Sequence, residues 1–402
     1  MINLLIILYH KMDLSNVFSF LTSLSQSEFD SLWNSYNLST EEIELMHASN
    51  DLWFDTAEKG YINLMKLLIY IGANVNIQDD GGNTALYVSS AFGHKDCTEL
   101  LIKAGVDLNI QNNDGWTALH FASMDGHKDC TELLINAGAD LNIQTNYSNT
   151  ALHIASMNGY EECVKLLFNA GTDLNIQNND GWTALQFASA YGHKDCVELL
   201  IKTGVDTSIQ NNDSWTALHY AIKYGHKDCV ELLIKAGTDL NIQTNYGNTA
   251  LHFASENDHK DCIELLINAG ANVNIQANDS WTALHLASEN NHKDCIELLI
   301  NAGADLNIQN NDGWTALHFA SYNGHKDCIE LLIYIGANVN IQNNDGWTAL
   351  HYACYHGHKE IVELLIKVGV DTSIQNNNGR TALQIVCRYG YKDIVTLLEK
   401  TD

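Results

Sequence analysis

The sequence contains no proline among its 402 residues, and it carries few positive charges. Asp and Glu number 49 against 21 Lys and Arg, which gives a formal net charge of −28 at pH 7. Nucleic-acid phosphates and anionic lipid headgroups attract basic protein surfaces, so this balance argues against nucleic acid and membrane as partners. Charged residues make up only 17% of the chain, whereas 46% is hydrophobic, which is enough to bury a core.

The sequence also lacks a hydrophobic run long enough to cross a bilayer, which needs about 20 residues. The most apolar stretch, residues 2–8, is far shorter. No Lys or Arg precedes it and no small-residue cleavage site follows it, so it makes a poor secretory signal. It can instead be a short apolar helix, or Met12 rather than Met1 can be the initiator.

Motifs of catalysis are missing as well. The chain has no glycine-rich phosphate loop, no nucleophile elbow and no unique acid/base pair. A catalytic site is normally unique in a chain, whereas most polar positions here recur many times. The sequence therefore predicts no enzyme activity, no catalytic residues and no cofactor.

What the sequence does contain is one repeated unit. The threonine of the motif TALH, with its variants, recurs at intervals of 33 residues without insertion or deletion. Such a period is the signature of a stack of small units that cannot bury their apolar faces alone. The threonines are Thr84, Thr117, Thr150, Thr183, Thr216, Thr249, Thr282, Thr315, Thr348 and Thr381.

Each unit predicts two short helices. In residues 117–125 the threonine is a good N-cap, and Ala118, Leu119 and Ala122 form an apolar stripe. Gly126 is predicted to end this helix in the left-handed conformation. Two repeats carry Asp258 or Asn291 in place of that glycine, and these residue types tolerate the same conformation.

The second helix of the unit shows apolar residues spaced by three and four positions. Cys130, Leu133, Leu134 and Ala137 are predicted to share one buried face. Gly138 follows as a terminator, and an extended turn returns the chain to the next threonine.

The unit DGWTALHFASMDGHKDCTELLINAGADLNIQNN closely resembles the ankyrin repeat. The resemblance covers residues 51–402 and departs from the family at one place, where alanine replaces the proline after the threonine. It implies an all-α solenoid of about eleven 33-residue helix-turn-helix units with β-turn or hairpin-like tips. The units start near 51, 84, 117, 150, 183, 216, 249, 282, 315, 348 and 381, with the first and last as atypical caps.

Residues 1–50 lie outside this pattern and are assigned to a separate N-terminal helical segment. Ser39 and Glu42 form a capping box ahead of a predicted helix. The segment is interpreted either as a helical cap on the first repeat or as a separate docking motif.

Cysteine and histidine also follow the repeat. Eight of the ten cysteines occupy one position on parallel helices about 10 Å apart, beyond the ~7 Å that a disulfide allows between Cα atoms. We therefore expect reduced thiols and a cytoplasmic location. The recurrent HKDC motif is not predicted to bind metal, because its histidine starts a helix while its cysteine faces the core. The resemblance implies a structural role for the TALH histidines, which bond threonine and backbone groups across adjacent turns.

Positions that differ between repeats are the candidates for binding. The resemblance implies that the residue before the threonine and the two residues ending the first helix project into the concave groove of the stack. The predicted partner-binding residues are Trp116, Trp182, Trp215, Trp281, Trp314, Trp347, Tyr191, Tyr224, Tyr322, Tyr355, Glu256 and Glu289. The tryptophans are equally consistent with rings that pack on the neighbouring turn and stiffen the stack.

The sequence thus predicts a monomeric, non-catalytic scaffold that binds a partner protein along its concave face. The alternative is an adaptor in which residues 1–50 recruit a second factor, such as ubiquitin-ligase machinery, while the repeats hold a target.

Overall fold

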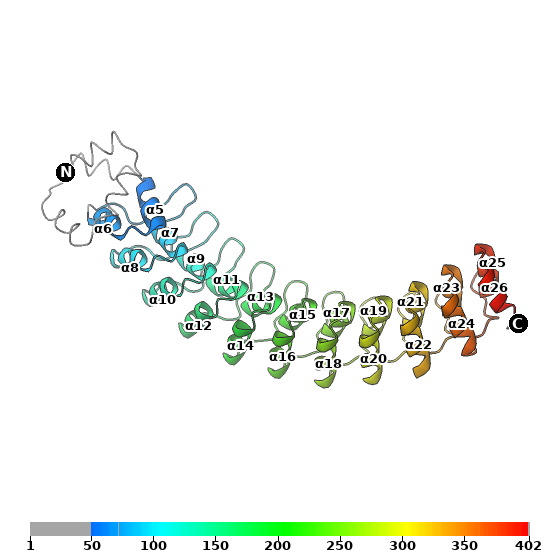
Figure 1. Ribbon diagram of the computed structural model, residues 1–402. Helices are drawn as coiled ribbons and strands as arrows, with labels where there is room; N and C mark the ends of the chain where they lie inside the picture. Colours follow the sequence, from blue (N-terminus) through cyan, green and yellow to red (C-terminus); the bar gives the residue numbers. More distant parts are fainter. Residues whose placement is uncertain (1–49, 71, 401–402) are drawn as a thin grey trace. The chain divides into compact units, whose positions relative to one another are not determined.

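The computed structural model describes residues 50–70 and 72–400, which form 22 helices in eleven pairs and no strand. The predicted all-α repeat architecture is confirmed (Figure 1). The first helices of the pairs are α5 (Asn50–Lys59), α7 (Ala85–Ala91), α9 (Ala118–Met124), α11 (Ala151–Asn158), α13 (Ala184–Ala190), α15 (Ala217–Lys223), α17 (Ala250–Glu256), α19 (Ala283–Glu289), α21 (Ala316–Asn323), α23 (Ala349–His356) and α25 (Ala382–Tyr389). The second helices are α6 (Ile62–Tyr70), α8 (Lys95–Lys103), α10 (Lys128–Asn136), α12 (Glu161–Asn169), α14 (Lys194–Lys202), α16 (Lys227–Lys235), α18 (Lys260–Asn268), α20 (Lys293–Asn301), α22 (Lys326–Ile335), α24 (Lys359–Lys367) and α26 (Lys392–Leu398).

The helices belong to two compact units. Unit 1 runs to Ala188 and takes in Lys202–Val205, and unit 2 comprises Ser189–Ile201 and the chain from Asp206 onward. Within each unit, the first helices of neighbouring repeats pack against one another, and the second helices do the same. Each repeat therefore contributes one layer to both rows, as expected for a solenoid.

The first helices begin and end as the sequence predicts. Thr150 is the N-cap of α11, and its hydroxyl accepts the N–H of His153. Gly159 ends α11 at φ 76, in the left-handed region that disfavours side chains. Asp258 and Asn291 adopt φ values of 57 and 63 at the equivalent position, which confirms the substitution argument.

The core lies between the two rows. Ala118, Leu119 and Ala122 are buried as predicted. The predicted face of the second helix is only partly right, because α10 buries Cys130, Thr131 and Leu134, and Leu133 is half-buried. Ala137 is exposed at the C-cap of α10, just before Gly138.

Both ends of the described array keep the two-helix unit. The first repeat lacks TALH, yet α5 forms and buries Trp53 and Ala57. The last repeat, which starts at Thr381, ends with the short helix α26, as the sequence predicts. The helical segment predicted for residues 1–50, its capping box and its proposed docking role lie almost entirely outside the described residues.

Asparagine ladders connect the turns between repeats. Asn146 donates its side-chain N–H to the carbonyl of Asn113 at 2.9 Å, and its backbone N–H to Asp114 at 3.0 Å. In unit 2, Asn344 donates to the carbonyl of Asn311 in the same way at 2.8 Å. Asparagine donates from both its side chain and its backbone N–H in these turns, whereas proline has neither donor.

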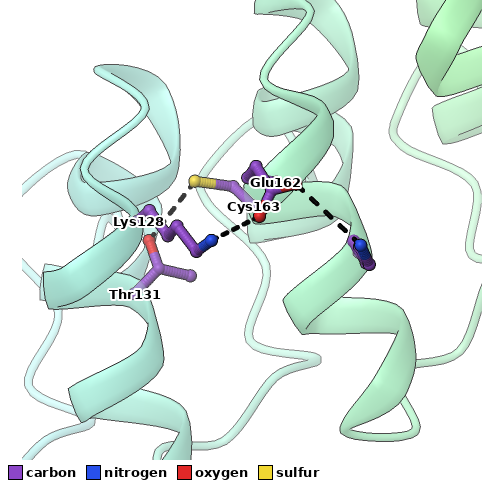
Figure 2. Close-up of polar contacts among 5 residues, drawn as sticks. Lys128, Thr131, Glu162 and Cys163 are labelled. Atoms are coloured by element: carbon purple, nitrogen blue, oxygen red, sulfur yellow. Dashed lines mark hydrogen bonds and ion pairs between the residues drawn. The ribbon is translucent and has the colours of Figure 1, made fainter.

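The second helices carry a ladder of ion pairs. Figure 2 shows Lys128 of α10 reaching Glu162 of α12, with the thiol of Cys163 beside the hydroxyl of Thr131. In unit 2, the ammonium of Lys260 lies 2.9 Å from the carboxylate of Asp294. The same lysine-to-acid step joins Lys95–Asp129, Lys194–Asp228, Lys227–Asp261, Lys293–Asp327, Lys326–Glu360 and Lys359–Asp393.

The cysteines are free thiols. Nine of the ten are buried, and Cys387 is exposed. Burial raises the pKa of Cys229 to about 11, which keeps this thiol protonated at neutral pH.

Candidate functional site

The turn before each first helix is closed by backbone groups of the residue that precedes the threonine. In one repeat, the N–H of Trp314 donates to the side chain of Asn310 at 2.8 Å, and its carbonyl accepts from the N–H of Asn310 at 2.8 Å. Arg380 closes the turn of Asn376 with the same pair of bonds. The turn therefore needs the backbone at this position and leaves its side chain free to vary.

The TALH histidine ties this turn to the next repeat. The backbone N–H of Thr282 donates to Nδ1 of His285 at 3.0 Å, so the ring carries its proton on Nε2. Nε2 in turn lies 3.1 Å from both the carbonyl of Ile308 and that of Trp314. This geometry confirms the structural role expected for these histidines.

Burial sets the charge state of this histidine. His285 is almost fully buried, and desolvation lowers its pKa to about 4 in spite of the two carbonyls it contacts. His120, His153, His219 and His318 have pKa values lowered to about 4 for the same reason. These rings are neutral at pH 7 and act as fixed hydrogen-bonding groups.

The second histidine series, from the Gly-His pairs, has a role that the sequence reasoning did not assign. Nε2 of His226 lies 3.0 Å from the carbonyl of Ala190, 36 residues earlier. A Cβ at Gly192 would approach that ring to 2.5 Å, which explains the glycine. Where Asp258 replaces this glycine, the following ring, His292, uses Nδ1 instead and contacts the carbonyl of Ser255 at 2.9 Å.

All six predicted tryptophans are half-buried, and their rings pack on first helices. In unit 2, the Trp314 ring lies 4.8 Å from Phe319 of its own repeat and 4.4 Å from Tyr352 of the next. The Trp281 ring lies 4.3 Å from Phe319 of the following repeat. These contacts show that the rings contribute to packing between repeats.

In unit 1, the predicted tryptophans pack in a similar way. The Trp116 ring lies 4.6 Å from Phe121, and Phe121 lies 4.1 Å from Tyr87 of the preceding repeat. The Trp182 ring lies 4.8 Å from Phe187. In both units the ring leaves part of its surface open, so packing and binding are compatible roles.

The predicted tyrosines lie at the exposed ends of the first helices. Tyr191 and Tyr224 are 57% and 53% exposed, and Tyr322 and Tyr355 are 41% and 37% exposed. We call the two consecutive residues that end each first helix, such as Tyr322 and Asn323 in α21, the first-helix ends. Large rings in such positions are unusual on a surface that contacts only water, and they are common anchors of protein interfaces.

The structure gathers several of these rings into one cluster in unit 2. The Tyr322 ring lies 4.3 Å from His356, His356 lies 4.8 Å from Tyr355, and Tyr355 lies 4.8 Å from Tyr389. Trp314 and Trp347 border the cluster at 5.6 Å from Tyr322 and 5.5 Å from Tyr355. We call these six residues the ring cluster.

The predicted acidic residues occupy the first-helix ends of the two repeats before the ring cluster. Partial burial and the charge of Glu256 raise the pKa of the Glu289 carboxyl. Within the described part of the chain, neither carboxylate forms an ion pair. Lys223, which ends the preceding first helix, lies 4.9 Å from the Trp215 ring instead.

Some exposed rings were not among the predicted residues. Phe92 and Tyr389 end first helices and are 54% and 47% exposed. They were left out of the predicted residues although their positions vary between repeats. Tyr147 and Tyr246 stand at turn tips and are 70% and 73% exposed. The signal for both tip residues was available, since each replaces the aspartate that most repeats carry there.

Among the described residues, no group of His, Cys, Asp and Glu is arranged to hold a metal ion. No helix of residues 50–70 and 72–400 is long and apolar enough to cross a membrane.

Comparison with known proteins agrees with the repeat geometry. A family model described as ankyrin repeats in three copies matches residues 53–145, 138–211, 203–277, 270–343 and 333–402. No curated protein matches the chain as a relative. Because these matches cover nearly the whole described array, the chain belongs to the ankyrin repeat family, whose members generally serve as protein–protein interaction modules.

Proposed function

We propose that this chain is a non-catalytic scaffold that binds a partner protein through its first-helix ends. The observation that carries the proposal is the contrast within each repeat. The residues that pack or cap are nearly identical in every copy, whereas Tyr191, Tyr224, Tyr322 and Tyr355 stand at positions whose side chain the fold does not specify. Large exposed rings at unspecified positions are what a binding surface requires.

The tryptophans fit this proposal as a supporting platform. Their indoles fix Phe319 and Tyr352 between repeats, and the exposed tyrosines stand next to them. A platform that is rigid before binding loses less conformational entropy when a partner docks. The proposal includes a reducing compartment, because nine buried free thiols show no sign of a disulfide framework.

The test compares three proteins in affinity capture from cells of the source organism. They are the natural chain, the variant Tyr322→Ala/Tyr355→Ala/Tyr389→Ala, and the matched control Tyr147→Ala/Tyr246→Ala/Tyr334→Ala. Each variant loses three exposed tyrosines, but those of the control lie at turn tips or at the end of α22. Captured proteins are identified by mass spectrometry, and circular dichroism checks the helix content of each variant.

The proposal expects proteins that the natural chain and the control capture and that the first variant loses while staying folded. Equal capture by all three chains would place the binding surface elsewhere. Loss with the control alone would move it to the turn tips.

A further inference from the structure

The first-helix ends of unit 2 carry two acidic residues followed by a cluster of exposed rings. Together these features indicate which kind of protein segment this surface binds. This inference rests on the proposed function and adds the chemical class of the partner. Glu256 ends α17 and Glu289 ends α19. The ring cluster begins on the next first helix, α21, with Tyr322, and continues on α23 with Tyr355.

Among the described residues, no lysine, arginine or histidine forms an ion pair with the carboxylates of Glu256 and Glu289. Elsewhere the chain pairs its acids with lysines, as Lys260 pairs with Asp294 on the second helices. The two glutamates have no such ion pair in the described chain, and partial burial together with the charge of Glu256 raises the pKa of the Glu289 carboxyl. A cation supplied from outside would relieve this repulsion, and the guanidinium of arginine or the ammonium of lysine is the side-chain cation available in a protein partner.

The ring cluster supplies the apolar part of the surface. Tyr322, Tyr355 and Tyr389 expose between about a third and a half of their surface. His356 links the rings of Tyr322 and Tyr355, and Tyr355 contacts Tyr389 directly. Nε2 of His356 is buried without a hydrogen-bond partner in the described chain, and burial lowers the pKa of this ring. A neutral ring among tyrosines leaves the cluster uncharged at pH 7, and the ring faces suit an aliphatic or aromatic side chain.

The repeat spacing sets the distance between the two contacts. Packed helices lie about 8–10 Å apart, and an extended chain advances about 3.3 Å per residue, so one repeat corresponds to about three residues of a bound segment. Tyr322 is one repeat beyond Glu289, and Tyr355 is two repeats beyond it.

We propose that the first-helix ends of unit 2 bind an extended, basic protein segment. Its lysine or arginine contacts Glu256 and Glu289, and an apolar side chain about three to six residues away contacts Tyr322 and Tyr355. The formal charge of −28 on the whole chain favours approach of the same class of partner, because a basic segment is steered towards an acidic protein.

The experiment uses the full chain and a phage-displayed library of random peptides about 12 residues long, which is enough to span both contacts. Selection runs at about 0.15 M salt, where the Debye length of about 8 Å suppresses long-range attraction. Enriched peptides are synthesised, labelled and titrated by fluorescence polarisation against the natural chain and three variants. The variants are Glu256→Gln/Glu289→Gln, Tyr322→Ala/Tyr355→Ala, and the matched control Glu264→Gln/Glu297→Gln.

The control removes the same charge from the same two repeats, but from exposed positions on α18 and α20. We expect enriched peptides with a Lys or Arg about three to six residues from an apolar residue, and we expect both the Glu256/Glu289 and the Tyr variants to weaken their binding at least tenfold, with the control within twofold.

Three outcomes would contradict the inference. Enriched peptides that are neutral or acidic, or that bind the Glu256→Gln/Glu289→Gln variant as well as the natural chain, would overturn the basic partner class. If those peptides still lose affinity for the Tyr variant, the proposed function stands and only the partner chemistry is wrong. If both variants bind like the natural chain, or if nothing is enriched, this inference fails, and the affinity capture described above then decides the proposed function.

Discussion

The exposed sides of the first and second helices differ in how their charges are satisfied. On the second helices, each lysine of the ladder reaches the acid of the following repeat, as Lys227 reaches Asp261 at 2.9 Å and Lys260 reaches Asp294 at 2.9 Å. At the first-helix ends, Glu256 and Glu289 lack such pairs within the described residues, and the tyrosines contact other rings, as Tyr322 contacts His356. On the second helices, whose sequence is nearly constant, charged residues pair with those of the neighbouring repeat. At the first-helix ends, whose sequence varies, the two carboxylates remain available to a partner.

The groups beneath these surfaces differ as well. The first-helix row is connected by buried neutral histidines and half-buried tryptophans, and the second-helix row is connected on its outside by solvated ion pairs. Acid should therefore weaken the contacts of the first-helix row, and salt should weaken those of the second-helix row. Three experiments test this division, from the largest expected effect to the smallest.

Acidification should have the largest effect. Five TALH histidines have folded-state pKa values lowered to about 4 from the ordinary 6.5, so the neutral form favours folding; they are His120, His153, His219, His285 and His318. Their contribution is complete above about pH 6.5 and is lost as the pH falls towards 4, by about 1.4 kcal/mol per pH unit for each ring. The unfolding temperature, followed by circular dichroism between about pH 7 and pH 4, should fall steeply.

A variant isolates the histidines from the many carboxylates of the chain. Gln186 already takes the histidine's place in one repeat, where it accepts the N–H of Thr183 at 2.8 Å. The variant His285→Gln/His318→Gln should therefore fold and should lose less stability on acidification than the natural chain. Parallel curves for the two proteins would show that the buried rings do not cause the acid sensitivity.

Removing one indole should have an intermediate effect. Trp314→Asn keeps a residue that occurs at this position in other repeats, but it removes the contacts with Phe319 and Tyr352. We expect a loss of about 2 kcal/mol, because a large half-buried ring that bridges two repeats leaves a gap. Urea unfolding measures the loss, and Tyr322→Ala, which removes an exposed ring, serves as the control with little change. Equal small losses would mean that the indole serves binding alone.

Breaking one rung of the lysine ladder should have the smallest effect. Lys260→Gln removes a solvated ion pair with Asp294, and such pairs contribute little to stability. The unfolding temperature should drop slightly at low salt and should match the natural chain in about 1 M salt, where the Debye length is about 3 Å. A drop as large as that of Trp314→Asn would show that the outer ladder supports the stack.

The repeat phase, the helix caps and the left-handed positions could be predicted because they depend on neighbours in the sequence. Thr150, Gly159 and Asp258 act within their own turn, so a single repeat carries the whole signal. The exposure of Ala137 was missed because a periodic pattern does not show where the helix ends relative to the core.

The contacts of the tryptophans could not be predicted because they join different repeats. Trp314 meets Tyr352, 38 residues later, and that pairing depends on the offset between successive layers rather than on the local pattern. The sequence left packing and binding as equal alternatives, and the structure establishes the packing. Whether the rings also bind a partner stays a prediction, as does the role of Glu256 and Glu289.

The asparagine ladder has a consequence for how this protein can change its length. The side chain of Asn146 bonds the carbonyl 33 residues before it, and that of Asn344 does the same. If a gene rearrangement adds or removes one whole unit of 33 residues, each asparagine side chain of the ladder still finds an equivalent carbonyl in the preceding repeat. A gain or loss of any other length breaks the register at once. The number of repeats can therefore change by whole units during evolution without disturbing the ladder. The length of the surface offered to a partner changes with it.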